Sequence, residues 1–480
     1  MSNFVDGAIV IGYIIIMFII GIVIYKRGRN YDDYLIAGRK FSPFFIVITL
    51  AAGISSAIMA VATLGFEVGM SGAWFFISLG IGAWILLFTI AGRLRALAQY
   101  SLTDIFEMRY GPAARVVIAI LGTLAYTILL SIGFVGGGYV LQSIFNIGLV
   151  PAMLIIAAPF ITYTALGGLW ASAVTNIVKF FILVAGVIVL IPAGIHSAGG
   201  WNALTAALPP GSFNLFSRDA LIMAFGFFWV LTLSMWVAAD IYQLVFSTKN
   251  IRTAKIGLSV AGLLIIVLGL MAAFIGMSAR VSFPNINPND AMTTLATTLG
   301  PGLRGLVFVA LLAGSAIAVV MYQLVAATLL VRGVWPKTKV SMNRVRLLSA
   351  GIGVAGLIFA TQGASIESLT LWTFRIIIPA SFVPTLAAFY WKRVNTTGAL
   401  ASSISGAATS GLWTWLVLPK LSINMQSILE PAFIGVLVSG IALVVGSYLS
   451  PVPSPEKLKL FALSQSNAAK VRAIPTDEVS

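Results

Sequence analysis

Long apolar runs, separated by short polar segments, recur along almost the whole chain. Helices of this length rise about 1.5 Å per residue and can cross a hydrocarbon layer about 30 Å thick. The runs are continuous rather than alternating, which excludes a transmembrane β-barrel. The pattern therefore predicts an all-α polytopic membrane protein with about 13 transmembrane helices. The predicted helices cover residues 6–25, 43–66, 72–92, 114–141, 150–165, 169–194, 217–246, 254–278, 301–331, 346–363, 366–391, 396–418 and 430–449.

The loops between these helices alternate between rich and poor in basic residues. The rich loops lie at 26–40, 93–109, 249–255, 332–344 and 392–393. The other loops carry only isolated basic residues, namely Arg218, Arg280, Arg304 and Lys420. The positive-inside rule places the rich loops in the cytoplasm. We therefore expect an integral protein of a bacterial inner (plasma) membrane, with the N-terminus outside and the C-terminus cytoplasmic.

The composition limits the classes of function. Of the 480 residues, 59% are hydrophobic and 9% are charged, and the net charge is +15. Because the positive charges are distributed over loops, we expect the lipid bilayer and not nucleic acid as a partner. The chain has no cysteine, which excludes disulfides and thiolate metal sites. No His/Asp/Glu cluster or nucleophile–base pair is evident, so the sequence predicts no enzyme, no cofactor and no obligate protein partner.

One charge lies deep inside a predicted helix. Lys179 occurs in the otherwise uncharged run LWASAVTNIVKFFILVAGVIVL, residues 169–190. It lies about 15 Å from the start of that run, near the middle of a bilayer. A charge at this depth costs at least about 3 kcal/mol on insertion scales, and such residues usually have a function.

Five segments carry recognisable motifs. They are DYLIAGRKFSPFF (33–45), SLTDIFEMRYG (101–111), YTALGGLWASAVTNIVK (163–179), ADIYQLVFSTKNIRTAK (239–255) and YWKRVNTTGAL (390–400). Together, in this order, they resemble the sodium:solute symporter family. The resemblance implies a leucine-transporter-like fold, whose core is two inverted five-helix repeats with a solute site near the bilayer midplane. It also implies a secondary active transporter that moves a small solute by alternating access.

The same resemblance divides the chain into six parts. These are an extra N-terminal helix with a cytoplasmic loop (1–42), a first inverted repeat (43–194), an outer loop (195–216), a second inverted repeat (217–391), two C-terminal helices (392–450) and a cytoplasmic tail (451–480).

Four uncharged residues are candidates for binding the solute. The first helix of each repeat is expected to be broken, and the segment AAGISSA (51–57) supports a break on its own. Ser55 and Ser56 could meet the solute there, or could bond back to their own helix. Trp229 and Thr232 of the predicted helix 217–246 could line the cavity, although such residues also serve in helix packing.

The ion-site positions depart from the family pattern. The resemblance implies one sodium site, made of two backbone carbonyls and of hydroxyls from a later helix. The carbonyls correspond to those of Ala51 and Ile54. Because they belong to the backbone, a different side chain at either position does not remove them. The hydroxyl positions correspond to Gly314, Ile317 and Ala318, or, one residue later, to Ser315, Ala318 and Val319. Neither register keeps the hydroxyl pair, and sodium prefers oxygen ligands.

A second departure lies beside Lys179. In the family signature Thr-Asp-x-x-Gln, this chain has Asn176 in place of the aspartate and Lys179 in place of the glutamine. An acidic position has become neutral, and an amine stands one helical turn further along. We hypothesise that the amine takes the place of sodium, because burial disfavours its charged form and would let it load and release a proton. The alternatives are a structural lysine, an ordinary sodium-coupled symporter, or a transporter-like sensor or receptor.

Arg375 is a second charge at membrane depth. It lies about nine residues, or about 14 Å, from the outer end of the predicted helix 366–391. The acids Glu67, Asp240 and Glu367 lie nearer to helix ends, so no deep counter-charge is obvious. A guanidinium binds carboxylates with a planar fork. We therefore expect a small anionic solute, a carboxylate, near Arg375; a structural tie of Arg375 to carbonyls or to Glu367 is the alternative.

Overall fold

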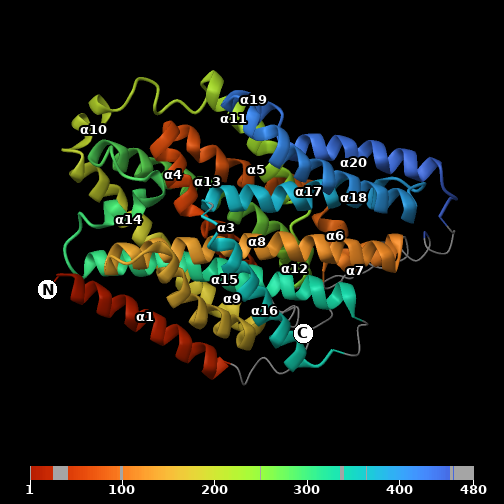
Figure 1. Ribbon diagram of the computed structural model, residues 1–480, viewed down its shortest axis with the longest axis horizontal. Coiled ribbons are helices and arrows are strands. Elements are labelled where there is room, and N and C mark those ends of the chain that lie inside the picture. The colour runs from red at the N-terminus through yellow and green to blue at the C-terminus, as the bar shows by residue number, and fades with distance from the viewer. Residues whose placement is uncertain are drawn as a thin grey trace.

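The computed structural model describes residues 2–24, 42–97, 101–248, 250–335, 340–363, 365–453 and 458. Helices account for almost all of this part of the chain, and the long ones run roughly along the horizontal axis of Figure 1. The whole 26–40 loop, the start of the 33–45 motif and nearly all of the 451–480 tail lie outside the described residues.

The helices follow the predicted apolar runs closely. They are α1 (Ser2–Ile24), α3 (Pro43–Ser55), α4 (Ile58–Val68), α5 (Trp74–Thr89), α6 (Ala91–Leu97), α7 (Leu102–Tyr110), α8 (Pro112–Phe145), α9 (Leu149–Ser197), α10 (Trp201–Ala207), α11 (Arg218–Phe227), α12 (Ala239–Phe246), α13 (Ile251–Ser282), α14 (Ala291–Ala296), α15 (Leu303–Val334), α16 (Met342–Ala360), α17 (Ile366–Tyr390), α18 (Thr396–Leu412), α19 (Ile423–Ile428) and α20 (Pro431–Tyr448).

The count of 13 membrane spans stays a prediction. Within the described residues, nine helical segments are long and apolar enough to cross a membrane. The predicted helices 150–165 and 169–194 form one run, α9, which holds two candidate spans at Leu149–Leu166 and Thr175–Ser197. The division into inverted repeats at 43–194 and 217–391 also stays a prediction.

Two predicted helices are interrupted. The predicted helix 43–66 is divided into α3 and α4 by a turn at Ser56 and Ala57. The predicted helix 217–246 passes from α11 through a π-helical turn, Phe228–Thr232, and leaves helical geometry before α12 begins at Ala239. Ala238 there has extended backbone angles, with φ −66° and ψ 113°. Such breaks free backbone groups for other partners inside the bundle.

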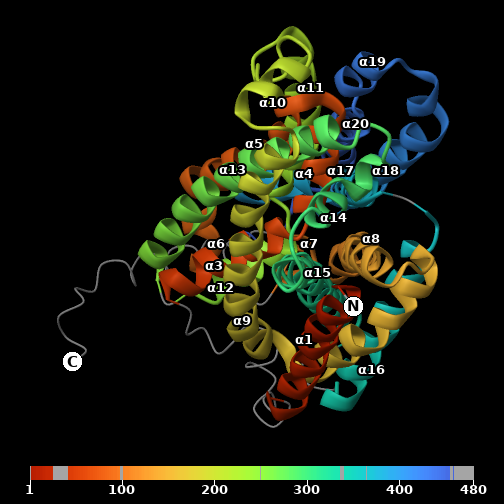
Figure 2. The same ribbon diagram turned by 90° about the vertical axis from the view of Figure 1, so that its left-hand side faces the viewer.

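Helix α15 forms the centre of the bundle, between α8 and α9 (Figures 1 and 2). In its most apolar stretch, 94% of the residues are buried. Small residues allow the close approach: a Cβ atom at Gly133 would lie 2.4 Å from the Ser315 carbonyl oxygen, and one at Gly186 would lie 2.3 Å from the Ala310 Cβ. This is the packing expected between membrane helices, where backbone proximity replaces a hydrophobic driving force.

Candidate functional site

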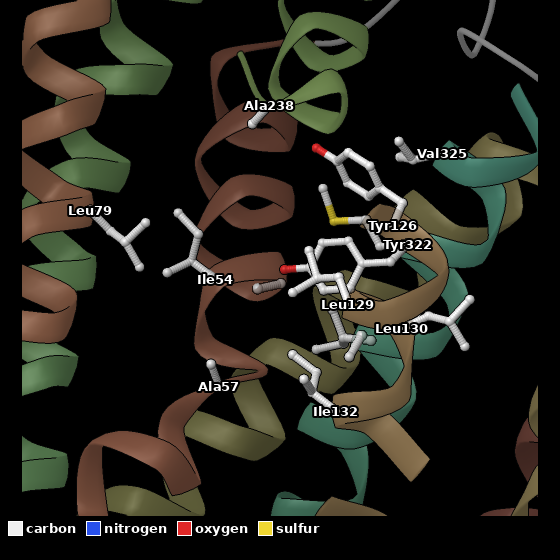
Figure 3. Close-up of a cluster of buried hydrophobic side chains, with 14 of the residues drawn as sticks. Ile54, Ala57, Leu79, Tyr126, Leu129, Leu130, Ile132, Ala238, Tyr322 and Val325 are labelled. Atoms are coloured by element: carbon white, nitrogen blue, oxygen red, sulfur yellow. The ribbon is translucent and has the colours of Figure 1, made fainter. Parts of the chain in front are cut away.

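A small central cavity lies where the two interrupted helices meet. Its lining residues come from α3, the α3–α4 turn, α5, α8, the α11–α12 break, α12, α15 and α17. They are Ile54, Ala57, Phe75, Leu79, Leu129, Ile132, Met235, Ala238, Asp240, Tyr322, Thr370 and Phe374. Figure 3 shows part of this cluster, with Ala57 at the point where the chain passes from α3 to α4. Broken helices that meet at a buried cavity are the usual setting of a solute site in transporters built from inverted repeats.

Three polar residues form a connected group beside the cavity. The Tyr126 hydroxyl donates to Asp240 Oδ1 at 2.5 Å, and the Asp240 amide donates to the same hydroxyl oxygen at 3.3 Å. The rings of Tyr126 and Tyr322 lie 6.0 Å apart. The Tyr322 hydroxyl donates to the Gly53 carbonyl at 3.0 Å, and both tyrosine hydroxyls are directed toward α3 in Figure 3. This group therefore joins the two breaks through α8 and α15.

Hydrogen bonds within the protein satisfy the carbonyls freed at the α3–α4 break. The Ser55 hydroxyl donates to the Ala51 carbonyl at 2.5 Å, and the Ser56 hydroxyl donates to the Gly53 carbonyl at 2.6 Å. The Ile54 carbonyl accepts from the Ala57 amide at 3.1 Å. Both serines therefore bond back to their own segment, which was the alternative left open by the sequence, and neither lines the cavity. Their role in binding a solute stays a prediction.

Lys179 lies in a separate, tight pocket. It is only 1% exposed, and its Nζ stands 4.8 Å from the centre of the Tyr163 ring, whose hydroxyl bonds to that of Thr175. The other lining residues are Ile14, Met17, Pro159, Phe160, Ala316 and Val320. Among the described residues, no carboxylate forms an ion pair with Lys179. An ammonium buried without an acid, against one aromatic face, is an unusual arrangement.

A model of the sodium:solute symporter family matches residues 34–406. The chain belongs to the sodium:solute symporter family. The assignment made from the five motifs is thereby confirmed, and with it a transmembrane symporter that is integral to the membrane.

Named relatives agree with this assignment. The chain is 27% identical to a sodium/proline symporter of Escherichia coli (strain K12), over 94% of each chain. It is 26% identical to the osmoregulated proline transporter OpuE of Bacillus subtilis (strain 168), over 94% of this chain and 96% of the relative.

The structure is similar to that of a Na⁺-coupled sialic acid symporter, with a TM-score of 0.77, 16% identity and coverage of 94% of this chain and 99% of the other. It also resembles a nucleobase-cation-symport-1 family transporter, with a TM-score of 0.62, 14% identity and coverage of 90% and 99%. These likenesses confirm the predicted all-α, leucine-transporter-like fold.

The predicted ion-site positions of this symporter are buried and poor in oxygen. Ile317 and Ala318 are fully buried, and a Cβ at Gly314 would contact Leu183. The Ser315 hydroxyl donates to the Leu311 carbonyl at 3.1 Å. In the described part of the chain, none of the predicted ion-site positions lines the Lys179 pocket.

Helix α15 separates the Lys179 pocket from the freed α3 carbonyls. The pocket contacts Ala316 and Val320, whereas Tyr322, on another face of the same helix, contacts Gly53. Lys179 therefore lies next to this region but not among its predicted ligands. Asn176, one turn before Lys179, is also buried, and its Oδ1 has no hydrogen-bond partner among the described residues.

Arg375 is paired, contrary to the expectation of a free guanidinium. Its Nε and Nη2 donate to the two carboxylate oxygens of Glu430, at 2.6 Å and 2.9 Å. Both side chains are buried. Glu430 directly precedes α20 and lies 55 positions from Arg375, so its place beside α17 could not be seen in the sequence. The argument for an anionic solute loses its basis, because it required an unpaired Arg375.

Trp229 and Thr232 pack away from the cavity. The Thr232 hydroxyl donates to the Ser78 carbonyl of α5 at 2.9 Å. The Trp229 ring lies 4.6 Å from that of Phe433. Neither residue lines the central cavity, and their part in solute binding stays a prediction. Asp240 and Tyr322, which do line it, were not among the sequence-based candidates, because an uninterrupted helix would have placed Asp240 near a membrane surface.

Proposed function

We propose that this chain is a secondary active transporter which moves a small solute through the central cavity by alternating access, coupled to protons through Lys179 and independent of sodium. The observation that carries the coupling is the buried Lys179 ammonium, which has no carboxylate partner among the described residues. An amine in such a site is readily neutralised, so that proton binding and release can accompany a conformational change.

The cavity supports transport rather than catalysis. Both interrupted helices contribute to its lining, and transporters built from inverted repeats hold the solute at such a place while one part of the bundle moves against the other. The family and the named relatives are transporters, which indirectly supports the expectation that the chain is not an enzyme. Among the described residues, no feature favours a sensor or receptor.

The side chains at the predicted ion-site positions support sodium independence. Gly314, Ile317 and Ala318 offer no side-chain oxygen, and the freed carbonyls already accept protein hydrogen bonds. Sodium would have to compete with these donors and would gain few ligands. Because Lys179 occupies a neighbouring pocket, we propose that it acts on α9 and α15 from there rather than from the sodium position itself.

Ordinary sodium symport is the second candidate. Its support is the names of the relatives, which include sodium/proline symporters at 27% and 26% identity. Those names also make proline the first solute to test, with sodium as the alternative coupling ion.

Uptake into vesicles separates the two candidates. The purified chain would be reconstituted into liposomes, and uptake of radiolabelled proline and of radiolabelled cyclopentylamine would be measured. Each solute would be tested under a sodium gradient at equal pH and under a proton gradient without sodium. We expect accumulation under the proton gradient alone. Stimulation of uptake many-fold by sodium at constant pH would establish ordinary symport and exclude the proposed coupling.

A further inference from the structure

We infer that the central cavity binds a small organic cation, a protonated amine with a compact apolar body, and that Asp240 is its counter-charge. This inference rests on the proposed function, since it names the class of solute that the transporter would carry. It reverses the sign of the charge that the sequence alone favoured.

Asp240 is the one charged residue among those that line the cavity. It is 7% exposed, and in the described part of the chain it has no basic partner within ion-pair distance. The neutral hydroxyl of Tyr126 donates a hydrogen bond to its carboxylate. A buried carboxylate without a cation is costly, and a cationic ligand would relieve that cost.

The walls of the cavity select against other polar solutes. They are apolar or aromatic, with Phe75, Phe374 and Tyr322 supplying rings that can face an ammonium group. The two hydroxyls present already donate elsewhere: that of Thr370 to the Ile366 carbonyl at 2.8 Å and that of Tyr322 to Gly53. A sugar would find too few hydrogen-bonding partners here, and a carboxylate would face Asp240 with like charge.

One acidic residue of α17, Glu367, lies near the cavity, and Glu67 of α4 lies beside it. Glu367 lies three and seven residues before Thr370 and Phe374, so the three side chains share one face of the helix. The exposed Glu67, at the end of α4, lies close enough to Glu367 for the two charges to interact.

The alternative is that Asp240 is only structural, holding the first turn of α12 against Tyr126. Binding to the purified full chain in detergent separates the two, since it requires no ion gradient. Three probes share one ring and differ in charge: cyclopentylamine, cyclopentanol and cyclopentanecarboxylate. We expect thermal stabilisation by the amine at concentrations where the other two have no effect. Equal stabilisation by the carboxylate, or none by the amine, would overturn the inference.

A pair of variants tests the residue itself. Asp240→Asn should lower the affinity for cyclopentylamine by about tenfold or more, because it removes the buried counter-charge. Asp219→Asn, at an exposed acid of α11, is the matched control and should bind the amine as the unchanged protein does. Full amine affinity in Asp240→Asn would overturn the inference. If Asp240→Asn does not fold, the selectivity of the unchanged chain among the three probes decides.

These results are separable from the proposed function. Absence of amine binding would refute the cationic site but would leave proton-coupled transport of another solute intact. Sodium-driven uptake in vesicles would refute the proposed coupling but would leave the preference for amines intact.

Discussion

Two cations at membrane depth, Lys179 and Arg375, differ in what surrounds them. Arg375 is bound by both oxygens of Glu430, whereas Lys179 stands against the ring of Tyr163. A bidentate ion pair neutralises the guanidinium within the protein and leaves few of its N–H donors for a solute. Lys179 has no carboxylate partner among the described residues, so under the proposed function its amine can bind and release a proton. Arg375 and Lys179 carry the same type of charge, and they differ in whether a carboxylate of the protein pairs with it.

The Arg375–Glu430 pair should contribute to stability. Arg375→Gln leaves Glu430 buried without a counter-charge, which we expect to destabilise the fold by about 3–5 kcal/mol. Arg375→Gln combined with Glu430→Gln should recover much of that loss. Thermal unfolding in detergent measures both, with the exposed Arg218→Gln as control. An unchanged melting temperature together with lost solute binding would instead place Arg375 at the solute, as the sequence first suggested.

Lys179 should carry the coupling. Lys179→Gln restores the residue of the family signature without restoring hydroxyls at Ile317 and Ala318. We therefore expect it to abolish accumulation driven by a proton gradient and to create no dependence on sodium. Exchange of solute across the membrane should survive, because exchange need not move the coupling ion. Uptake and exchange in the same vesicles measure this, with the exposed Lys420→Gln as control; proton-driven accumulation by Lys179→Gln would contradict it.

Residue-scale prediction from sequence succeeded for local properties and failed for distant partners. The burial of Lys179 could be predicted, because it depends on the apolar run around it. The partner of Arg375 could not, because Glu430 reaches it only through the packing of α20 on α17. Asp240 was missed for a related reason, since the break before α12 moves it from a helix end to the cavity.

At the scale of helices, glycines set how closely α8 and α15 approach. A Cβ at Gly133 would lie 2.4 Å from the Ser315 carbonyl oxygen, and rigid backbone cannot yield. We expect Gly133→Ala to destabilise the protein by about 1–3 kcal/mol through overpacking. Gly351→Ala in α16 is the matched control: nothing lies within 4 Å of a Cβ there, so it should be neutral or stabilising by up to about 1 kcal/mol. Equal melting temperatures for both variants would contradict this packing.

Apolar runs located the helices but not their interruptions. The ends of α1, α16 and α17 fall within a few residues of the sequence-based bounds. The break at Ser56 and Ala57 was anticipated from glycine and paired serines, whereas that at residues 235–238 carries no such signal. Interruptions inside a bundle depend on partners from other helices, such as the Tyr322 hydroxyl at Gly53.

At the scale of the whole molecule, the two ends of the bundle differ in charge. The N-terminus and α10 lie toward one end in Figure 1, and α6 and α7, with the basic residues of 93–109, lie toward the other. The side that each end faces is still predicted only from the basic loops. The N-terminus is expected outside, together with the 195–216 loop that contains α10.

Labelling of single cysteines tests that orientation directly, because the chain has none of its own. A membrane-impermeant maleimide applied to intact cells should label Ala206→Cys, at an exposed position of α10, and should spare Lys337→Cys until the membrane is opened. Residue 337 lies outside the described residues but within the basic loop 332–344. The physical reason is the cost of moving clustered Lys and Arg side chains across the bilayer during insertion. Strong labelling of Lys337→Cys from outside, with Ala206→Cys protected, would invert the topology.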